Sequence, residues 1–282
     1  MVELGERWNM MKDLITDEQV EEIIFVTKNI YDFDFDGYSR ASLKRRLNRI
    51  MLLKRLDFFD LKSTLTNNED FFHYFINEIT VNVTEMFRDP KFFKSLKENV
   101  LPYLSSFPHI KVWNAGCSTG EELYSFAILF EEQGLYNRSF FYGTDVNHKV
   151  LETAKEGIYD LQKMKHYSEN YLALGGGKSL ANHYVAQYDA ASISRHLKKN
   201  VLFSMHNLVS DGPFNEFQVI SCRNVLIYFN PELQKSVINL FYESLANFGF
   251  LCLGGKETIR DPLLAKKFKA VDKKNNIYQK IN

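Results

Sequence analysis

The residues best suited to ligand chemistry lie in the stretch 111–122, which reads KVWNAGCSTGEE. The stretch opens with β-type residues, passes through small ones and ends in two carboxylates, Glu121 and Glu122. Apolar residues then recur at the spacing of one helix face: Leu123, Phe126, Ala127 and Phe130. Strand, small-residue turn and helix form the first unit of a nucleotide-type α/β domain, in which the turn and the helix N-terminus meet a ligand.

The glycine spacing in this stretch excludes two familiar phosphate-binding sites. It matches neither the dinucleotide pattern G-x-G-x-x-G nor the P-loop pattern G-x-x-x-x-G-K-[ST]. Two carboxylates in the first helical turn would repel a phosphate, but they suit a cationic, hydroxyl-rich ligand such as S-adenosylmethionine. The alternative is that Glu121 and Glu122 only favour the positive end of the helix dipole.

Length and composition indicate an ordered, water-soluble protein with one large or two modest domains. The chain has 282 residues, 45% hydrophobic and 25% charged, and its 35 basic residues equal its 35 acidic ones, so any basic binding face must be local. Cys117, Cys222 and Cys252 lack the spacing of a metal site or a disulfide framework. The first residues contain no apolar segment of the kind expected in a signal peptide, and no apolar run approaches ~20 residues. We therefore expect a cytoplasmic protein without a metal and without direct membrane insertion.

Residues 1–80 are expected to form an all-helical domain. Thr16 and Gln19 have the spacing of a capping box, ahead of a helical face that contains Val20 and Ile23. Residues 58–79 continue in helical style. A third helix is expected between these two regions, at 40–51, where the sequence reads RASLKRRLNRIM.

The helix expected at 40–51 has one apolar stripe and several basic faces. Its stripe consists of Leu43, Leu47, Ile50 and Met51. The candidate residues for binding a protein substrate are Arg40, Lys44, Arg45, Arg46 and Arg49. No acid lies among them, and like charges repel along a helix, so this surface is expected to meet an acidic partner. The alternative is a solvated face neutralised by the acidic turn 32–36, while nucleic acid is not expected because no aromatic residue interleaves the basic run.

Residues 81–98 are expected to join the helical domain to the next one and to contribute to a ligand site. Asn82 and Thr84 are short polar residues flanked by valines, and their alternative role is helix capping. Because no glycine or proline occurs between Gly37 and Pro90, we expect a helical join rather than a flexible linker.

Residues 99–282 show an alternating pattern that predicts a largely parallel sheet. Asp145 ends the second expected strand, where an acid typically accepts hydrogen bonds from ribose hydroxyls; its alternative role is the N-cap of the next helix. The alternation breaks down at about 160–200, which indicates a small insertion with a strand expected near His183–Tyr188. The other expected strands, the last two forming a hairpin, are Ile110–Trp113, Phe140–Thr144, Val201–Met205, Phe217–Ser221, Phe250–Leu253, Phe268–Val271 and Asn276–Lys280.

Five motifs occur in a characteristic order along the chain. They are NVTEMFR at 82–88, AGCSTGEE at 115–122, TDV at 144–146, Asn207-Leu208, and CRNVLIYF at 222–229. Together they resemble the CheR chemotaxis-receptor methyltransferases, which use S-adenosylmethionine to methylate glutamate side chains. The likeness covers nearly the whole chain, including the basic helix.

The resemblance implies a Rossmann-like methyltransferase sheet with a small β-subdomain insertion, preceded by an all-helical N-terminal domain. It implies catalytic roles for Arg88 and Tyr228, with Tyr228 where the methyl group meets the substrate. The residues implied in binding S-adenosylmethionine are Asn82, Thr84, Arg88, Ala115, Gly116, Glu122, Asp145, Asn207, Leu208, Arg223 and Asn224. The implied partner is the cytoplasmic helical-bundle domain of chemoreceptors. Some relatives also dock a receptor C-terminal peptide on the β-subdomain, and the residues leave open whether this chain does.

The sequence departs from the family pattern at three places. Asn114 and Leu123 stand where the family usually has Ser and Pro, and Gly255–Glu257 replaces a usual His-Ser-Glu. These changes affect the expected substrate fit more than the cofactor site. Two other functions stay open: a carboxyl methyltransferase of a non-chemotaxis signalling system, and a non-catalytic module that binds S-adenosylmethionine. The intact set of Arg88, Arg223, Asn224 and Tyr228 argues against the second.

Overall fold

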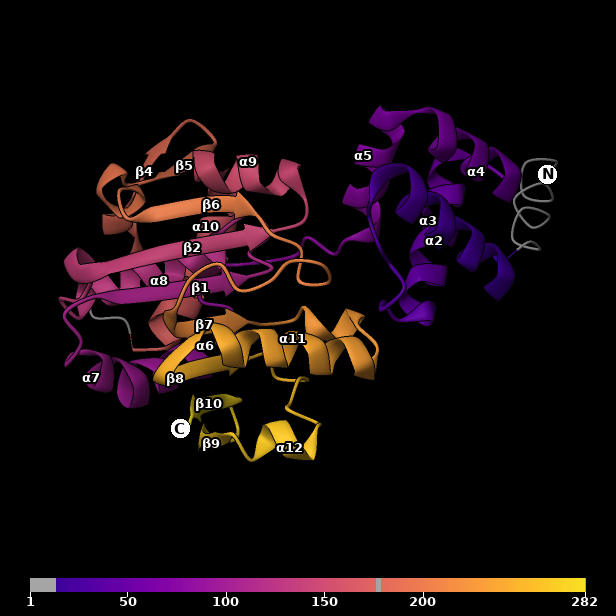
Figure 1. Ribbon diagram of the computed structural model, residues 1–282. Coiled ribbons are helices and arrows are strands. Elements are labelled where there is room, and N and C mark those ends of the chain that lie inside the picture. The colour runs from indigo at the N-terminus through magenta and orange to yellow at the C-terminus, as the bar shows by residue number, and fades with distance from the viewer. Residues whose placement is uncertain (1–13, 176–178, 282) are drawn as a thin grey trace. The chain divides into compact units, whose positions relative to one another are not determined.

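A computed structural model describes residues 14–175 and 179–281, which form two compact units (Figure 1). The first unit holds the described part of Met1–Val81 together with the short segment Tyr228–Leu233. The second holds Asn82–Ile227 and the chain from Gln234 onward. The fold class expected from the sequence, an all-helical part followed by a Rossmann-like sheet with an insertion, is confirmed.

The described part of the first unit contains four helices, α2 (Asp17–Tyr31), α3 (Arg40–Lys54), α4 (Phe58–Asn67) and α5 (Glu69–Ile79). The capping box expected ahead of α2 is present: Gln19 N donates to Thr16 Oγ1 at 3.2 Å, and Thr16 N donates to Gln19 Oε1 at 3.0 Å. The helical stretch 58–79 is two helices, because the Asn68 side chain accepts from Phe71 N and starts a new one.

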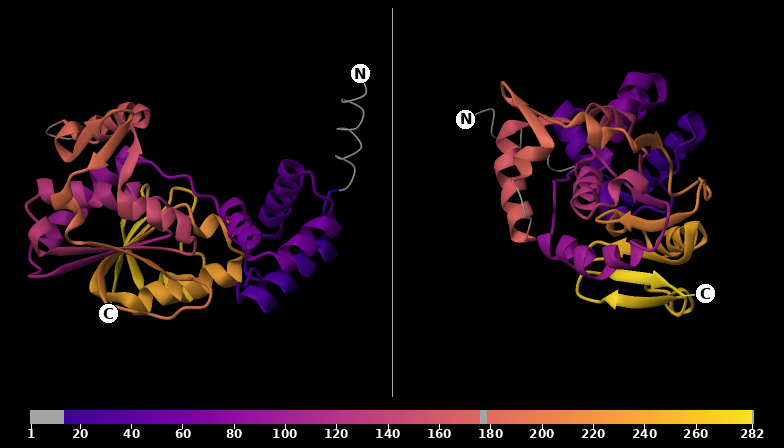
Figure 2. Two further views of the ribbon diagram at one scale, coloured as in Figure 1. Left: turned by 90° about the horizontal axis from the view of Figure 1, so that it is seen from above. Right: turned by 90° about the vertical axis from the view of Figure 1, so that its left-hand side faces the viewer.

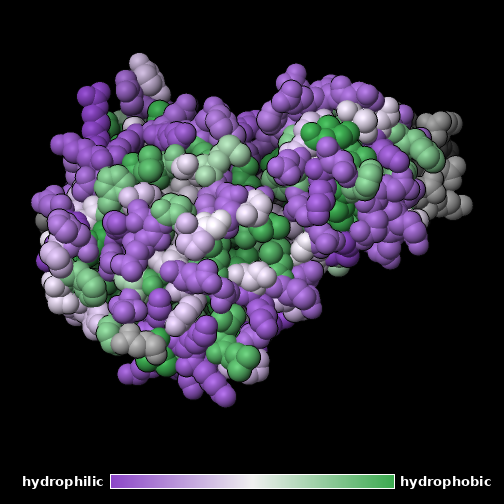
Figure 3. Space-filling model, viewed as in Figure 1, coloured by the Kyte–Doolittle hydropathy of each residue, from purple (hydrophilic) through white to green (hydrophobic). Residues whose placement is uncertain are grey.

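An apolar core holds these four helices together. The stripe expected on α3 is buried as predicted and consists of Leu43, Leu47, Ile50 and Met51. Each such side chain contributes roughly 1.5–3 kcal/mol when fully removed from water. The exposed faces are mostly polar but include apolar side chains such as Phe25 and Leu52. Figure 3 shows this unit as largely purple with green patches between.

The segment between α5 and the second unit is not helical, so the expected helical join is wrong. Residues 80–85 form neither helix nor strand. The helix caps on either side are Thr80, at the end of α5, and Asp89, before α6 (Pro90–Ser95). Asn82 and Thr84 are therefore not helix caps.

The second unit is organised by a seven-stranded sheet in the order β6-β2-β1-β7-β8-β10-β9. The first five strands of that order run parallel, and β10 and β9 are antiparallel, as the sequence predicts. Their bounds are β1 Ile110–Ala115, β2 Ser139–Asp145, β6 Val201–Met205, β7 Phe217–Cys222, β8 Leu245–Leu253, β9 Phe268–Asp272 and β10 Ile277–Lys280. The carboxyl ends of β6, β2, β1, β7 and β8 therefore meet at one edge of the sheet.

Helices cover both faces of this sheet. The crossover helices are α8 (Glu121–Glu132), α9 (His148–Glu156) and α11 (Pro231–Ser244). Figure 2 (left) shows the sheet nearly edge-on, with the orange α11 on one face and magenta helices on the other. Residues 206–216, all of them described, contain no helix, so β6 and β7 are joined by a loop. The remaining short helical segments are η1 (Leu96–Val100), α7 (Leu101–Leu104), η2 (Tyr136–Arg138) and α12 (Pro262–Ala265).

The insertion expected at about 160–200 is a three-stranded antiparallel sheet in the order β3-β5-β4. The strand expected near His183–Tyr188 is β4 (Tyr184–Gln187), and it pairs with β5 (Ala190–Ile193), which the sequence pattern missed. β3 is Ile158–Asp160, followed by α10 (Leu161–Ala173). The short 3-10 turns η3 (Leu180–His183) and η4 (Arg195–Lys198) flank β4 and β5.

Among the described residues, no helix combines the length and the apolar character that crossing a bilayer requires.

Candidate active site at the carboxyl edge of the sheet

The turn after β1 follows a path that only glycine permits at two points. The amides of Gly116 and Cys117 both donate to the carbonyl oxygen of Thr144, at 2.8 and 2.9 Å. Gly116 has a φ of +73°, and a Cβ on it would lie 2.5 Å from Val225 Cγ2. Gly120, just before α8, has a φ of +90°, and a Cβ there would lie 2.9 Å from a side chain of α9. Conformation and packing together fix this turn at the end of the central strand.

Asp145, at the end of β2, holds the same turn in place. Its Oδ2 accepts the N–H of Ser118 at 2.9 Å, and its Oδ1 accepts the N–H of Asn147 at 3.0 Å. Burial raises the pKa of Asp145, and the backbone N–H donors oppose that rise. Helix α9 is capped by Asn147, whose side chain accepts from Lys149 N, so the alternative role of Asp145 as the helix cap is wrong. Each carboxylate oxygen of Asp145 retains capacity to accept a further hydrogen bond, for example from a hydroxyl.

Glu121, the first residue of α8, ties the turn to the insertion. Its Oε2 accepts from Thr119 Oγ1 at 2.6 Å, and its Oε1 accepts from Tyr167 Oη of α10 at 3.5 Å. Tyr159 Oη, on β3, donates to the carbonyl of Thr119 at 2.8 Å. Burial raises the pKa of Glu121. The carboxylate is thus held by the protein in the first turn of α8.

Glu122, the second carboxylate, forms a buried ion pair with Arg223. Arg223 Nη1 donates to Glu122 Oε2 at 2.9 Å, with the two side chains only 2% and 9% exposed. The other oxygen, Oε1, accepts from Asn114 Nδ2 at 2.8 Å and from Ser221 Oγ at 2.7 Å. The protein therefore supplies three donors to this carboxylate, more than the helix dipole alone would explain. A direct contact between Glu122 and a cofactor stays a prediction.

Arg223, which follows β7, is held from several sides. Its Nη2 lies 2.7 Å from Asp89 Oδ2, and its guanidinium lies 3.9 Å from the centre of the Phe92 ring. With Glu122 on one side and Asp89 on the other, the charge of Arg223 is balanced within the protein. This arrangement makes Arg223 an organising cation of the site.

Arg88 differs from Arg223 in its surroundings. It is half-buried, and the hydrogen bond found for its side chain runs from Nη1 to the carbonyl of Val83, at 3.3 Å. No carboxylate of the described residues lies within ion-pairing distance of it. The Arg88 carbonyl, meanwhile, lies 3.5 Å from Arg223 Nη1. The structure thus brings Arg88, Glu122 and Arg223 together and leaves the Arg88 charge available to an anionic group.

Asn224 adopts a left-handed conformation with a φ of +63°. Its N–H donates to Glu257 Oε2 at 2.9 Å, and its amide oxygen is buried. Glu257, in the turn after β8, is the residue that fixes this loop. The sequence had singled out Glu257 only as part of the altered Gly255–Glu257 segment.

Asn207 and Leu208, in the loop after β6, lie at the same edge of the sheet. Asn207 N donates to Asp211 Oδ2 at 2.8 Å, and Asn207 Oδ1 accepts from Val209 N at 3.0 Å. Leu208 is buried, and it offers an apolar surface at the end of the strand that neighbours Asp145. These positions suit a flat, apolar group that is edged by polar atoms.

Three predicted site residues lie in connecting segments rather than at strand ends. Asn82 and Thr84 are half-buried within 80–85. Tyr228 ends the 3-10 turn η5 (Leu226–Tyr228) and belongs to the helical unit, where its carbonyl accepts from Ser39 N at 2.8 Å. Their predicted roles toward a cofactor or a substrate stay predictions.

Buried polar atoms at the sheet edge test whether S-adenosylmethionine fits. Four of them have no hydrogen-bond partner among the described residues: Asn114 Oδ1, Ser118 Oγ, Arg223 Nε and Asn224 Oδ1. Most of these atoms can accept hydrogen bonds, and the surrounding carboxylates of Glu121, Glu122 and Asp145 outnumber the buried cation Arg223. A ligand with a sulfonium, an ammonium and ribose hydroxyls supplies the matching donors and positive charge. The residues present therefore fit this cofactor.

The basic helix α3 is more fully neutralised than its own sequence suggests. Three of its five candidate residues form ion pairs with acids from neighbouring elements, at distances between 2.7 and 3.5 Å. The pairs are Arg40 with Glu21 and Asp36, Lys44 with Asp17, and Arg49 with Glu78. Arg45 is exposed and Arg46 half-buried, and for neither is an acidic partner found in residues 14–175 and 179–281.

Sequence reasoning missed the residues that support the predicted site. Asn114 and Ser221 hold Glu122, Asp89 holds Arg223, and Glu257 holds Asn224. A polar residue near the end of an otherwise apolar strand, as at Asn114 and Ser221, is the signal that could have found two of them. Pairs such as Asp89 and Arg223 join segments that are distant in the sequence, so no local sequence pattern predicts them.

Two family models match this chain in succession. The CheR methyltransferase all-alpha domain matches residues 19–80, and the CheR methyltransferase SAM binding domain matches residues 82–277. The second match includes the whole sheet edge described above.

Individual relatives support the same grouping. A protein of Pseudomonas putida that carries the name methyltransferase Cher3 is 42% identical over 96% of this chain and 100% of its own length. A chemotaxis protein methyltransferase of Listeria monocytogenes is 32% identical over 88% of this chain and 94% of its own. Among solved structures, the N-methyltransferase NodS from Bradyrhizobium japonicum, in complex with S-adenosyl-L-homocysteine, is 15% identical over 60% of this chain and 62% of that chain. Its TM-score of 0.33 is too low to support an argument.

Proposed function

The chain belongs to the CheR methyltransferase family of S-adenosylmethionine-dependent enzymes, and from that premise we propose that it methylates glutamate side chains of chemoreceptors. The product would be a glutamate methyl ester on the cytoplasmic helical-bundle domain of the receptor. The observation that carries the proposal is the match of the family's cofactor domain to 82–277, in a chain whose relatives are named chemotaxis protein methyltransferases.

We assign the cofactor to the carboxyl edge of the sheet. Asp145 would accept from the ribose hydroxyls, and Asn207 and Leu208 would flank the adenine. Asn224 would offer its amide oxygen to the ammonium. Arg88, for which no acidic partner is found among the described residues, would pair with the cofactor's carboxylate. Arg223 and Glu122 would shape the methionine end through their ion pair, since their charges already balance each other.

The remaining cofactor contacts come from the turn and from the junction. Ala115 and Gly116 would contribute backbone at the end of β1. Asn82 and Thr84 would close over the cofactor from 81–98. In this assignment residues 1–80 serve the protein substrate, and residues 99–282, with the β-subdomain at about 160–200, serve the chemistry.

The chemistry needs no general base on the enzyme. A glutamate carboxylate has a pKa near ~4.3, so the attacking oxygen is already ionised at neutral pH. When bound, the cofactor supplies an electrophilic methyl group on a sulfonium. The reaction neutralises charge, so a site that excludes water and holds the acceptor oxygen in line favours it.

Tyr228 and Arg88 have different proposed roles. Tyr228 would orient the acceptor carboxylate through its hydroxyl. Arg88 would anchor the cofactor and close the site without pairing the attacking oxygen. A tight Arg–carboxylate pair would stabilise the charged ground state more than the less charged transition state, which would slow the reaction.

The proposed receptor-binding face is α3, and its ion pairs reduce the number of candidate residues that are available to a receptor. Of the five candidate cations, Arg45 and Arg46 have no acidic partner among the described residues and would meet an acidic helical bundle directly, whereas Arg40, Lys44 and Arg49 would have to exchange partners. A receptor C-terminal peptide could add to β4, which pairs with β5 along one edge and carries the exposed Val185.

Incubation with methyl-labelled S-adenosylmethionine tests the substrate. Membranes and the soluble fraction of the source cells would each be added to the enzyme, with heat-treated enzyme as the control. Label on a receptor-sized membrane protein is the expected result. Label confined to a soluble protein would favour a carboxyl methyltransferase of another signalling system. No transfer, with cofactor binding measured separately, would favour a non-catalytic binding module.

A further inference from the structure

The turn after β8 contains a buried carboxylate, Glu257, that is bonded to backbone rather than to side chains. Its Oε2 accepts the N–H groups of Gly254 at 2.5 Å and Asn224 at 2.9 Å, and its Oε1 accepts the N–H of Ile227 at 3.3 Å. The residue is 5% exposed. One carboxylate therefore joins two loops, the one after β8 and the one after β7.

Close backbone packing makes this arrangement specific. A Cβ on Gly254 would lie 2.6 Å from Glu257 Oε2 and 2.7 Å from Asn224 N, closer than real atoms come. The carbonyl of Gly254 accepts from Asn276 Nδ2 at 2.8 Å, which anchors the turn to the final hairpin. Gly254 thus allows the carboxylate to reach the loop after β7, and Asn276 holds it there.

The bonded loop carries residues that the proposed function uses. Asn224 has the left-handed φ of +63°, a conformation that Asn adopts more readily than most other non-glycine residues. Its amide oxygen is buried without a partner in the described parts of the chain. Ile227 precedes Tyr228 directly, so a bond to Ile227 N–H restrains the start of the segment that bears the tyrosine.

Both side-chain oxygens of Glu257 must act as hydrogen-bond acceptors, because each of them faces backbone N–H groups. An ionised carboxylate accepts on each oxygen, whereas an amide such as Gln presents an NH₂ donor at one of them. An NH₂ group in the place of Oε2 would face the N–H groups of Gly254 and Asn224, and one in the place of Oε1 would face the N–H of Ile227, so in either orientation hydrogen bonds are lost. Burial raises the pKa of Glu257, while the N–H groups bonded to it act in the opposite direction.

We propose that Glu257 is a positioning residue for methyl transfer, which sets the loop 224–227 so that the Asn224 oxygen and Tyr228 meet the cofactor and the acceptor. This inference rests on the proposed function of the same site. Glu257 touches neither reactant and acts through the loop. The segment Gly255–Glu257, which departs from the usual family residues, keeps the one side chain that this role requires.

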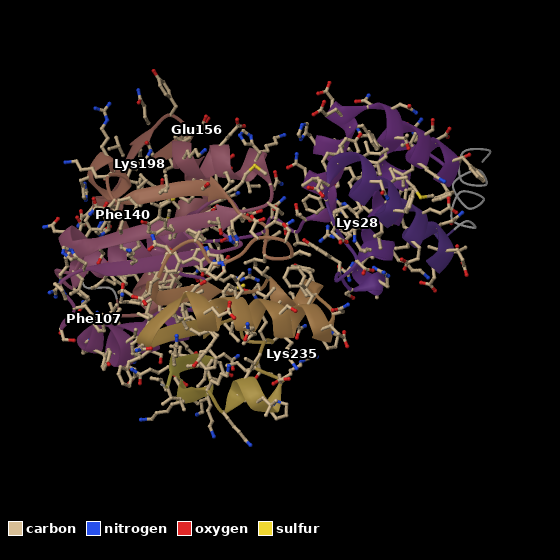
Figure 4. All side chains as sticks on the ribbon, viewed as in Figure 1. Lys28, Phe107, Phe140, Glu156, Lys198 and Lys235 are labelled. Atoms are coloured by element: carbon tan, nitrogen blue, oxygen red, sulfur yellow. The ribbon has the colours of Figure 1, made fainter. Side chains whose placement is uncertain are left out.

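The test compares Glu257→Gln with the matched control Glu156→Gln. Glu156 is an exposed residue at the end of α9 (labelled in Figure 4). Per folded molecule, Glu257→Gln should lower kcat about 100-fold, the scale expected for a displaced reacting group, with little change in KM for the acceptor protein. Hydrogen exchange of the Asn224 and Ile227 amides, measured without cofactor, should accelerate at least about tenfold. The control should change none of these.

Two further variants keep the proposal falsifiable if Glu257→Gln does not fold. Glu257→Asp keeps the acceptor oxygens on a shorter stem and should recover part of kcat and of the amide protection. Gly254→Ala keeps the carboxylate but displaces it, and it should lower kcat and expose the same two amides.

Wild-type kcat and unchanged exchange of both amides in Glu257→Gln, or in Gly254→Ala, would overturn the proposal. Failure of the proposed function gives a different result. In that case the wild-type enzyme methylates no receptor, while the exchange of Asn224 and Ile227 and the affinity for S-adenosylmethionine still report on the loop.

Discussion

At the sheet edge, some residues stabilise the site and others are available to bind a ligand. Arg223 is balanced by Glu122 and Asp89, so its charge serves the architecture. Arg88 has no such partner among the described residues, so its charge is available to a ligand. Removing one member of a balanced buried pair leaves an uncompensated charge, which costs stability.

Glu122→Gln tests whether the buried ion pair between Glu122 and Arg223 stabilises the fold. Loss of the buried carboxylate leaves Arg223 with one acidic partner, and the free energy of unfolding should fall by about 3–5 kcal/mol. Urea unfolding followed by circular dichroism measures the change. Glu22→Gln, which breaks the exposed pair with Lys62, is the matched control and should have little effect. If Glu122→Gln and Glu22→Gln had equal free energies of unfolding, the stabilising role assigned to Glu122 would be wrong.

Asp145→Asn tests the pH dependence of cofactor affinity. Because burial raises the pKa of Asp145 above its ordinary 3.8, this carboxyl binds a proton at higher pH than an exposed aspartate does. The folded state then holds more protons than the unfolded chain, so this group's share of the unfolding free energy falls as pH rises through the raised pKa. Ribose hydroxyls prefer the ionised form, so affinity for S-adenosylmethionine should fall as pH is lowered.

Calorimetry between about pH 8 and about pH 5 checks this expectation. The wild-type dissociation constant should rise toward acid pH. Asp145→Asn should bind about tenfold more weakly at neutral pH, the scale of a lost hydrogen bond to a charged group, and depend less on pH. Asp189→Asn, an exposed aspartate in the insertion, should keep the wild-type profile. If the dissociation constant of Asp145→Asn depended on pH as steeply as that of the wild type, the proposed contact between Asp145 and the ribose would be wrong.

Tyr228→Phe tests the orienting role of the tyrosine hydroxyl. The variant should lower kcat about 100-fold, because a single positioned donor in an active site has effects of that size. Affinity for S-adenosylmethionine should change less than about threefold. Tyr188→Phe, at an exposed tyrosine of the insertion, serves as the control. A large loss of cofactor binding in Tyr228→Phe would show that the tyrosine supports the cofactor instead.

At the scale of elements, the basic helix α3 shows why sequence alone overstated its free charge. Its own sequence contains no acid, but Glu21 and Asp17 reach it from α2 and Glu78 from α5. These acids are distant in sequence and come together only through packing of the helices. The apolar stripe of α3, by contrast, was predictable because its spacing repeats within the helix itself.

Arg45→Glu tests the receptor-binding role of α3. Arg45 is exposed and has no acidic partner in the described ranges, so reversing its charge should slow receptor methylation about tenfold at low salt, and the effect should shrink at high salt where charges are screened. Binding of S-adenosylmethionine should not change. Arg260→Glu, at an exposed arginine of the second unit, is the matched control. Equal methylation rates for the two variants at low salt would mean that the basic face of α3 is only solvated and does not bind the receptor.

The positions of the parallel strands were predictable for a similar reason. Each is a short apolar run, and helical segments separate most of these runs along the chain. β5 was missed because Ala190–Ile193 is small and short, and the join at 80–85 was taken for helix because it lacks glycine and proline. The supporting contacts of the site, such as Glu257 with Asn224, join segments that no spacing rule connects.

At the scale of the whole molecule, two units contribute different residues to one proposed activity. The second unit contains the strand edge with its acceptors and buried carboxylates, and the first contains the basic helix and the segment Tyr228–Leu233. The family match spans both, residues 19–80 and 82–277. Under the proposed function, the second unit would supply most of the cofactor site, and the first would supply the docking face together with Tyr228.

Mild base treatment of the methylated product tests the central claim most directly. The receptor signalling domain would be methylated with labelled S-adenosylmethionine, isolated, and exposed to base, and the volatile label would be collected. A glutamate methyl ester releases its label as methanol under these conditions, and we predict that nearly all of the label is released. Label that stays on the protein after base would mean an N-methyl or C-methyl product, and it would contradict glutamate methylation.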